Sequence, residues 1–73
     1  MASREVVSSV TGVIFELPAK SGDAVAQGDV IAVVESMKME IAIVSPCAGR
    51  LASMLVAADQ PVDEGQVIAI VEA

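Results

Sequence analysis

Histidine, tryptophan and tyrosine are absent from this 73-residue sequence, and cysteine and phenylalanine occur only once each. The lack of histidine removes the commonest general base and a common metal ligand, which excludes most nucleophilic triads and zinc sites. Since Phe15 is the only aromatic residue, the core has to be built from valine, isoleucine, leucine, alanine and methionine. These absences argue against an enzyme in its own right and against a metal site.

Positive charge is also scarce, because four lysines and arginines oppose ten acidic residues and give a net charge of −6. Four cations cannot form a patch that binds phosphates, so we expect neither a nucleic-acid partner nor an anionic membrane. No apolar run approaches the roughly 18 residues that span a bilayer. Cys47 has no second cysteine to pair with, and we therefore expect a reducing, cytoplasmic setting.

The sequence is rich in short runs of β-branched residues, at 30–34, 41–44 and 67–71. Such runs, bounded by turn-forming residues, are typical of β-strands. Their nearly continuous apolar character favours strands buried in a sandwich or a small barrel. Five glycines separate the runs and are expected at turns, with a structural role only: Gly12, Gly22, Gly28, Gly49 and Gly65. The pattern predicts one small all-β domain covering residues 1–73.

The chain repeats itself after 37 residues, with ten identities in about thirty aligned positions. The repeat predicts two copies of one β unit, at about 7–36 and 44–73, facing each other about a pseudo-twofold axis. The link between the copies is then a hairpin that contains Lys38. By the same symmetry, the two chain ends should lie at the opposite edge of the domain.

Lys38 is one of only two lysines and lies within the stretch ESMKME. A lysine at a loop tip is usually just a solvated charge, but Met37 and Met39 flank this one, and exposed thioethers are uncommon unless a partner uses them. Glu35 and Glu40 favour the charged ammonium, which is not a nucleophile. Lys38 is therefore a better candidate for modification by another protein than for catalysis.

The turn itself is a second reason to single out this lysine. If Met37 and Lys38 are the central residues of a two-residue hairpin turn, both need a positive φ, a conformation that normally selects Asn-Gly. Local preferences tend to be broken at functional sites.

The ESMKME stretch resembles the biotin attachment motif, Ala-Met-Lys-Met in most members, of the biotinyl domain of biotin-dependent carboxylases. The resemblance covers the chain from about Val6 to Glu72 and includes residues 22–29 and 45–49. Between Phe15 and Val25 there is no room for the extra "thumb" loop of some bacterial carriers, so the chain resembles the thumbless type. The resemblance implies a flattened β-barrel, or barrel–sandwich hybrid, of two four-stranded antiparallel sheets.

The resemblance also implies a function. Biotin would be attached covalently to Lys38 by a biotin protein ligase, and would carry a carboxyl group from a biotin carboxylase to a carboxyltransferase. Met37 and Met39 would be the motif flanks, and Glu35 a contact for the ligase. The domain would catalyse neither reaction and would be monomeric in isolation. Its setting would be the mitochondrial matrix if it belonged to a eukaryotic carboxylase. Ser36 departs from the usual alanine.

Two other functions remain open on the sequence alone. A lipoyl domain also modifies a hairpin lysine, although its motif usually places aspartate before the lysine and alanine after it. An unmodified structural barrel is the second alternative, and it leaves the lysine between two methionines unexplained. We expect no functional role for Lys20, Cys47 or Met54, which are interpreted as a surface charge, a small structural residue and core filler.

Overall fold

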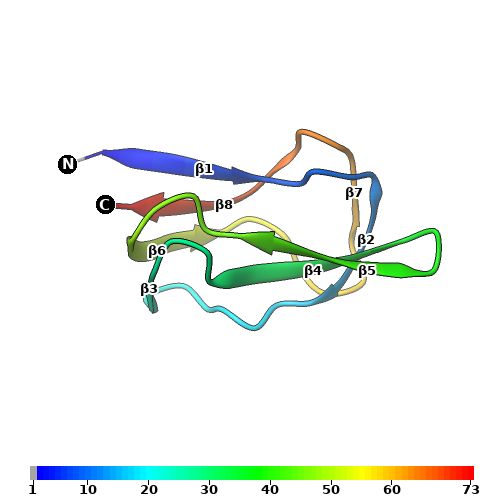
Figure 1. The fold of residues 1–73 in the computed structure, drawn as a ribbon, viewed down its shortest axis with the longest axis horizontal. Helices are drawn as coiled ribbons and strands as arrows, with labels where there is room; N and C mark the ends of the chain where they lie inside the picture. Colours follow the sequence, from blue (N-terminus) through cyan, green and yellow to red (C-terminus); the bar gives the residue numbers. More distant parts are fainter. Residues whose placement is uncertain (1) are drawn as a thin grey trace.

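The computed structural model describes residues 2–73 and folds them into eight β-strands. The strands are β1 (Ser3–Val7), β2 (Gly12–Glu16), β3 (Ala24–Val25), β4 (Val30–Ser36), β5 (Met39–Val44), β6 (Gly49–Met54), β7 (Pro61–Val62) and β8 (Val67–Glu72). They form two four-stranded antiparallel sheets (Figure 1). We call β5-β4-β2-β7 the hairpin sheet and β1-β8-β6-β3 the terminal sheet. The predicted all-β barrel–sandwich hybrid is confirmed, and residues 2–73 include no helix that could span a membrane.

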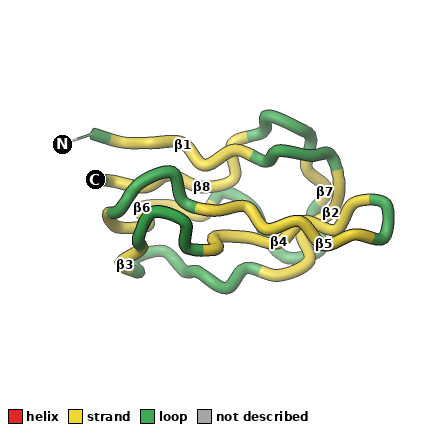
Figure 2. The backbone as a smooth tube through the Cα atoms, viewed as in Figure 1, coloured by secondary structure: helices red, strands yellow, loops and turns green. Residues whose placement is uncertain are grey.

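A shift of 37 residues carries each strand of the first half onto a strand of the second, β1 onto β5 and β4 onto β8. Each pairing in one sheet therefore has a counterpart in the other, β1 with β8 corresponding to β5 with β4. The sequence repeat was interpreted as two halves that face each other. In the structure, neither half forms a sheet of its own. The halves interleave, because each sheet takes two strands from each half (Figure 2). The most apolar strands, β4 and β8, thereby gain a hydrogen-bonded neighbour on both sides.

Side chains at the turns follow the same repeat. Ser8 Oγ donates a hydrogen bond to the carbonyl of Val10 at 2.6 Å, and Ser45 Oγ donates to the carbonyl of Cys47 at the same distance. Both serines are almost fully buried, so these bonds satisfy hydroxyl groups that water cannot reach. The repeat thus extends from the sequence to individual polar contacts.

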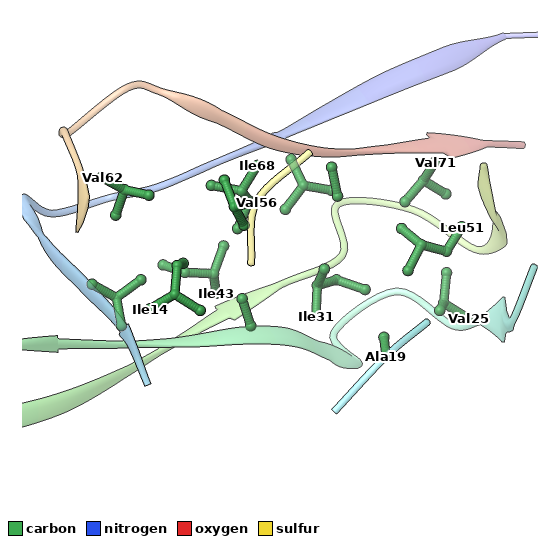
Figure 3. Packing of buried hydrophobic residues seen from close by; sticks show 14 residues of the cluster. Ile14, Ala19, Val25, Ile31, Ile43, Leu51, Val56, Val62, Ile68 and Val71 are labelled. Carbon is green, nitrogen blue, oxygen red and sulfur yellow. The ribbon is translucent and has the colours of Figure 1, made fainter. Parts of the chain in front are cut away.

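The core lies between the two sheets and is purely aliphatic (Figure 3). Its largest completely buried members are Ile14, Ile31, Leu51 and Ile68, two from each half. Burying a side chain of this size stabilises a fold by about 1.5–3 kcal/mol. Met54 and Cys47 are half-buried and pack against this cluster, which confirms their structural interpretation.

Two of the glycines do not lie at turns, and the prediction for them was wrong. Gly12 begins β2 and Gly49 begins β6, whereas Gly22, Gly28 and Gly65 have the positive φ of turn glycines. A Cβ on Gly12 would overlap the carbonyl oxygen of Glu35 and lie 2.9 Å from a methyl group of Val34. A side chain is excluded there because two strands approach closely, a requirement that the sequence does not distinguish from a turn.

The hairpin between β4 and β5 and the two chain ends lie at opposite ends of the molecule (Figure 1). The N–H of Ala73 donates to the carbonyl of Ala2 at 2.9 Å, so the termini run side by side along β1 and β8. The molecule measures 36 Å along its longest axis and only 19 and 18 Å across. Whatever is attached at the termini is therefore kept far from the hairpin, as the repeat predicts.

Candidate functional site

Met37 and Lys38 are the two central residues of the turn between β4 and β5. The last pair of the ladder is Ser36 with Met39, and Met37 and Lys38 have φ angles of 52° and 66°. Two consecutive positive φ angles define the type I′ geometry that normally selects Asn-Gly. Each side chain in this left-handed region costs about 1–2 kcal/mol. The predicted turn, and the local strain in it, are confirmed.

Both methionines of the motif lie outside the core. Met37 is 92% exposed and Met39 is 61% exposed, and Lys38 between them is also exposed. Neither thioether can be explained as core filler, unlike Met54, which packs against the buried cluster. The tip of the hairpin therefore presents one cationic and two apolar side chains to solvent.

Two acidic side chains stand at the base of this tip. Glu35 on β4 and Glu40 on β5 are directly opposite each other in the ladder, and both are exposed. Like charges at opposed positions destabilise a strand pair. Lys38 is the only cation within residues 35–40.

The hairpin is attached to the body of the protein through Ser36. Ser36 Oγ donates a hydrogen bond of 2.8 Å to the carbonyl of Thr11, in the loop between β1 and β2. Thr11 Oγ1 in turn accepts a hydrogen bond of 3.1 Å from the N–H of Glu64, in the turn before β8. Sequence reasoning identified Ser36 only as a departure from the usual alanine and missed this connection, which involves residues 25 and 53 positions apart.

The other residues considered at the sequence level are not brought to the hairpin. Lys20 is exposed in the loop before β3, and its backbone N–H donates to the Asp23 carboxylate at 2.9 Å. Strand β3 lies at the end of the molecule away from the hairpin (Figure 1). Across residues 2–73, no group of acidic or cysteine side chains is placed to hold a metal ion, and no pocket is present.

The fold and the site together define a class of protein. An all-β body presents one lysine at the tip of a strained turn, between two exposed methionines and away from both chain ends. This arrangement is typical of carrier modules.

Comparison with known proteins identifies the family within this class. The family model described as "Biotin-requiring enzyme", for the biotin and lipoyl attachment family, matches residues 2–71. The chain therefore belongs to the biotin/lipoyl attachment family. This match confirms the predicted cofactor, biotin, and together with the carboxylase relatives it confirms the predicted class of biotin carboxyl carrier domain.

Relatives of two kinds share this domain. The Mycobacterium leprae homolog of biotinylated protein TB7.3 is 29% identical over 69 residues, which cover 94% of this chain and 97% of that protein. Pyruvate carboxylase of Aspergillus niger is 39% identical over 61 residues, covering 84% of this chain but 5% of the enzyme. The crystal structure of Kluyveromyces lactis urea carboxylase matches with a TM-score of 0.93 and 25% identity, over 99% of this chain and 6% of that one. The chain thus spans a small protein nearly completely and large carboxylases only in one domain.

Proposed function

We propose that this domain carries a carboxyl group on biotin bonded to Lys38 Nζ, as the non-catalytic carrier component of a biotin-dependent carboxylase. The observation that supports the proposal most directly is the position of Lys38. It is exposed at the tip of a strained turn, between two methionines that the core does not use. A turn with these φ angles would be more stable with Asn-Gly, so its present residues are explained by a function of their side chains.

Attachment converts the lysine ammonium into an amide. Lys38 Nζ attacks the carboxyl carbon of biotin that a biotin protein ligase has activated. The C–N bond forms, the activating group leaves, and the ammonium has given up two protons when the amide is complete. The reaction removes one positive charge from a chain whose net charge is −6. After attachment, nothing within residues 35–40 offsets Glu35 and Glu40.

Each residue of the motif has a separate part in this proposal. The type I′ turn holds the Lys38 side chain away from the body of the protein, so the ligase can reach Nζ without unfolding the hairpin. Met37 and Met39 offer apolar contacts to the proteins that handle the tip, and Glu35 offers the ligase a negative charge. Bound biotin supplies the ring that accepts a carboxyl group at a biotin carboxylase and releases it at a carboxyltransferase.

The shape of the domain suits a carrier that visits two sites. The tip and the termini are at opposite ends of a 36 Å molecule, so a tether at the termini leaves the tip free to move. Tethering raises the effective concentration of the attached group at both sites. A monomer is the simplest state for such a carrier, and we propose that the isolated domain is monomeric.

Carboxyl transfer onto the domain tests this function. The biotinylated chain is incubated with ATP, labelled bicarbonate and the biotin carboxylase of its source organism, and label bound to the chain is counted. Wild type and Lys20→Arg should accept the label in equal amounts, whereas Lys38→Arg should remain unlabelled with an unchanged melting temperature. Label on the Lys38→Arg chain would contradict the assignment of Lys38, and an unlabelled but lipoylated wild type would favour a lipoyl carrier.

Substituting the methionines separates recognition from packing. Met37→Leu and Met39→Leu should leave stability unchanged, because both side chains are largely exposed. We expect both variants to be biotinylated but carboxylated more slowly. Full rates in both would show that the thioethers serve no function that leucine cannot replace.

A further inference from the structure

The outer face of the hairpin sheet is apolar, although it faces solvent. Strand alternation directs Ile14, Val34 and Ile43 into the core and their neighbours outward. We call the outward set the hairpin-sheet face, and it consists of Val13, Phe15, Val30, Val33, Ala42 and Val44. Four of its members are large hydrophobic residues that are 39–47% exposed.

The terminal sheet provides an internal control for this observation, because the repeat places an equivalent residue at each position. Val13 corresponds to Arg50, and Ala42 corresponds to Glu5. Phe15 corresponds to Ala52. The other three members, Val30, Val33 and Val44, correspond to Val67, Ile70 and Val7, which are also apolar. The same fold therefore accepts charged or small residues at three of the six positions, and apolar side chains at those three are not required for folding.

The two faces differ most in side-chain size at Phe15, whose counterpart is Ala52. Phe15 is the only aromatic side chain of the protein, it is 47% exposed, and it does not belong to the buried cluster. Aromatic side chains bury more apolar area than any other type and are enriched at protein interfaces. A chain with one aromatic residue has thus placed it on a surface instead of in the core.

The hairpin-sheet face is continuous with the proposed attachment site. Along β4 and β5 the outward pairs are Val30 with Val44, then Val33 with Ala42, then Glu35 with Glu40, and the turn follows. The apolar rows therefore lead to the acidic pair, and the turn that contains Lys38 follows that pair. A protein bound to this face would lie beside the hairpin.

We propose that the hairpin-sheet face docks the biotin carboxylase component, through a partner surface with an apolar centre and a rim of lysine and arginine. The inference rests on the proposed function. A biotin carboxylase binds ATP and bicarbonate, both anions, and the approach to such a site is electropositive. Glu16, Glu35 and Glu40 give the face an acidic rim. Acylation of Lys38 removes the cation at the tip, so the face complements a basic partner better once the chain is biotinylated.

The test exchanges residues between the two faces. Val13→Arg with Phe15→Ala gives the hairpin-sheet face the residues of its counterpart. The control, Arg50→Val with Ala52→Phe, makes the reverse change on the terminal sheet. The rate at which each biotinylated chain is carboxylated is measured with ATP, bicarbonate and the biotin carboxylase of the source organism, at increasing concentrations of the chain. The exchange on the hairpin-sheet face should raise the KM for the chain about tenfold with kcat nearly unchanged, while the control stays near wild type.

The KM of the wild-type chain should rise with salt concentration, and Glu40→Gln should weaken that dependence.

Other occupants give different results, and each would overturn the proposal. An unchanged KM would show that the face does not dock the carboxylase. An equal rise in the KM for the ligase would make the ligase the occupant, and a wild-type dimer that the exchange dissociates would make it a second copy of this chain. A wild-type chain that is not biotinylated, or that accepts no carboxyl group, would refute the proposed function itself and is recognised before the variants are compared.

Discussion

Replacing Met37-Lys38 by Asn-Gly should make the domain more stable while removing its modification site. The φ angles of 52° and 66° lie in the left-handed region, where a residue with an ordinary side chain costs about 1–2 kcal/mol. Glycine escapes this cost but loses about 0.5–1 kcal/mol more backbone entropy on folding, and asparagine tolerates the region better than methionine does. The double change should therefore raise the free energy of unfolding by about 1–2 kcal/mol, because the two gains add and the entropy of glycine offsets part of them.

Urea and thermal unfolding of the unmodified proteins measure this difference. One kcal/mol corresponds to about 4–8 °C in Tm for a domain of this size. The matched control is Met37→Ala with Lys38→Ala, which removes the same side chains but keeps two Cβ atoms in the left-handed region. Since Met37 is 92% exposed, its removal alone loses little packing. The reasoning is refuted if the Asn-Gly protein melts at or below the wild-type temperature, or if the Ala-Ala protein is stabilised equally.

Substitutions at three further positions test the local structure, all by urea unfolding. Gly12→Ala should destabilise by about 1–3 kcal/mol or more, because its Cβ would overlap the Glu35 carbonyl; a neutral result would mean that the two strands can separate. Asp59→Gly should stabilise by up to about 1 kcal/mol, since Asp59 has a φ of 69° and its counterpart in the repeat is Gly22; a loss of stability would show that the Asp59 side chain contributes more than its backbone costs. Ser36→Ala should lose about 0.5–1.5 kcal/mol with its hydrogen bond to the neighbouring loop, and Ser36→Thr should restore part of it; equal stability of all three proteins would contradict an anchoring role.

The fold could be predicted because the strand pattern and the repeat can both be recognised in the sequence without knowing which strands pair. The runs predicted at 30–34, 41–44 and 67–71 correspond to β4, β5 and β8. Strands β4 and β8 end two residues and one residue later than predicted, and β5 begins two residues earlier. The repeat also predicted that Lys38 lies opposite the chain ends. The interleaving of the halves could not be derived, because a sequence repeat relates residues to their copies but not to their partners in a sheet.

The site was predictable where neighbouring residues define it and not where distant ones do. Met37 and Lys38 are next to each other, so their positive φ angles could be expected on the condition that they are the central residues of a two-residue turn. The bond from Ser36 to Thr11 joins residues 25 positions apart, and no local pattern marks it. The exposure of Phe15 depends on which side of β2 faces the core, and a five-residue strand with Val13 on one side and Ile14 on the other does not show this.

The measurement that tests the central claim most directly is the intact mass of the protein produced with biotin and an active biotin protein ligase, followed by peptide mapping. The account predicts an increment of one biotinyl group, located on the peptide that contains Lys38 and on no peptide that contains Lys20. An unmodified mass in the presence of a ligase that biotinylates a known carrier would contradict it, and so would an increment located on Lys20.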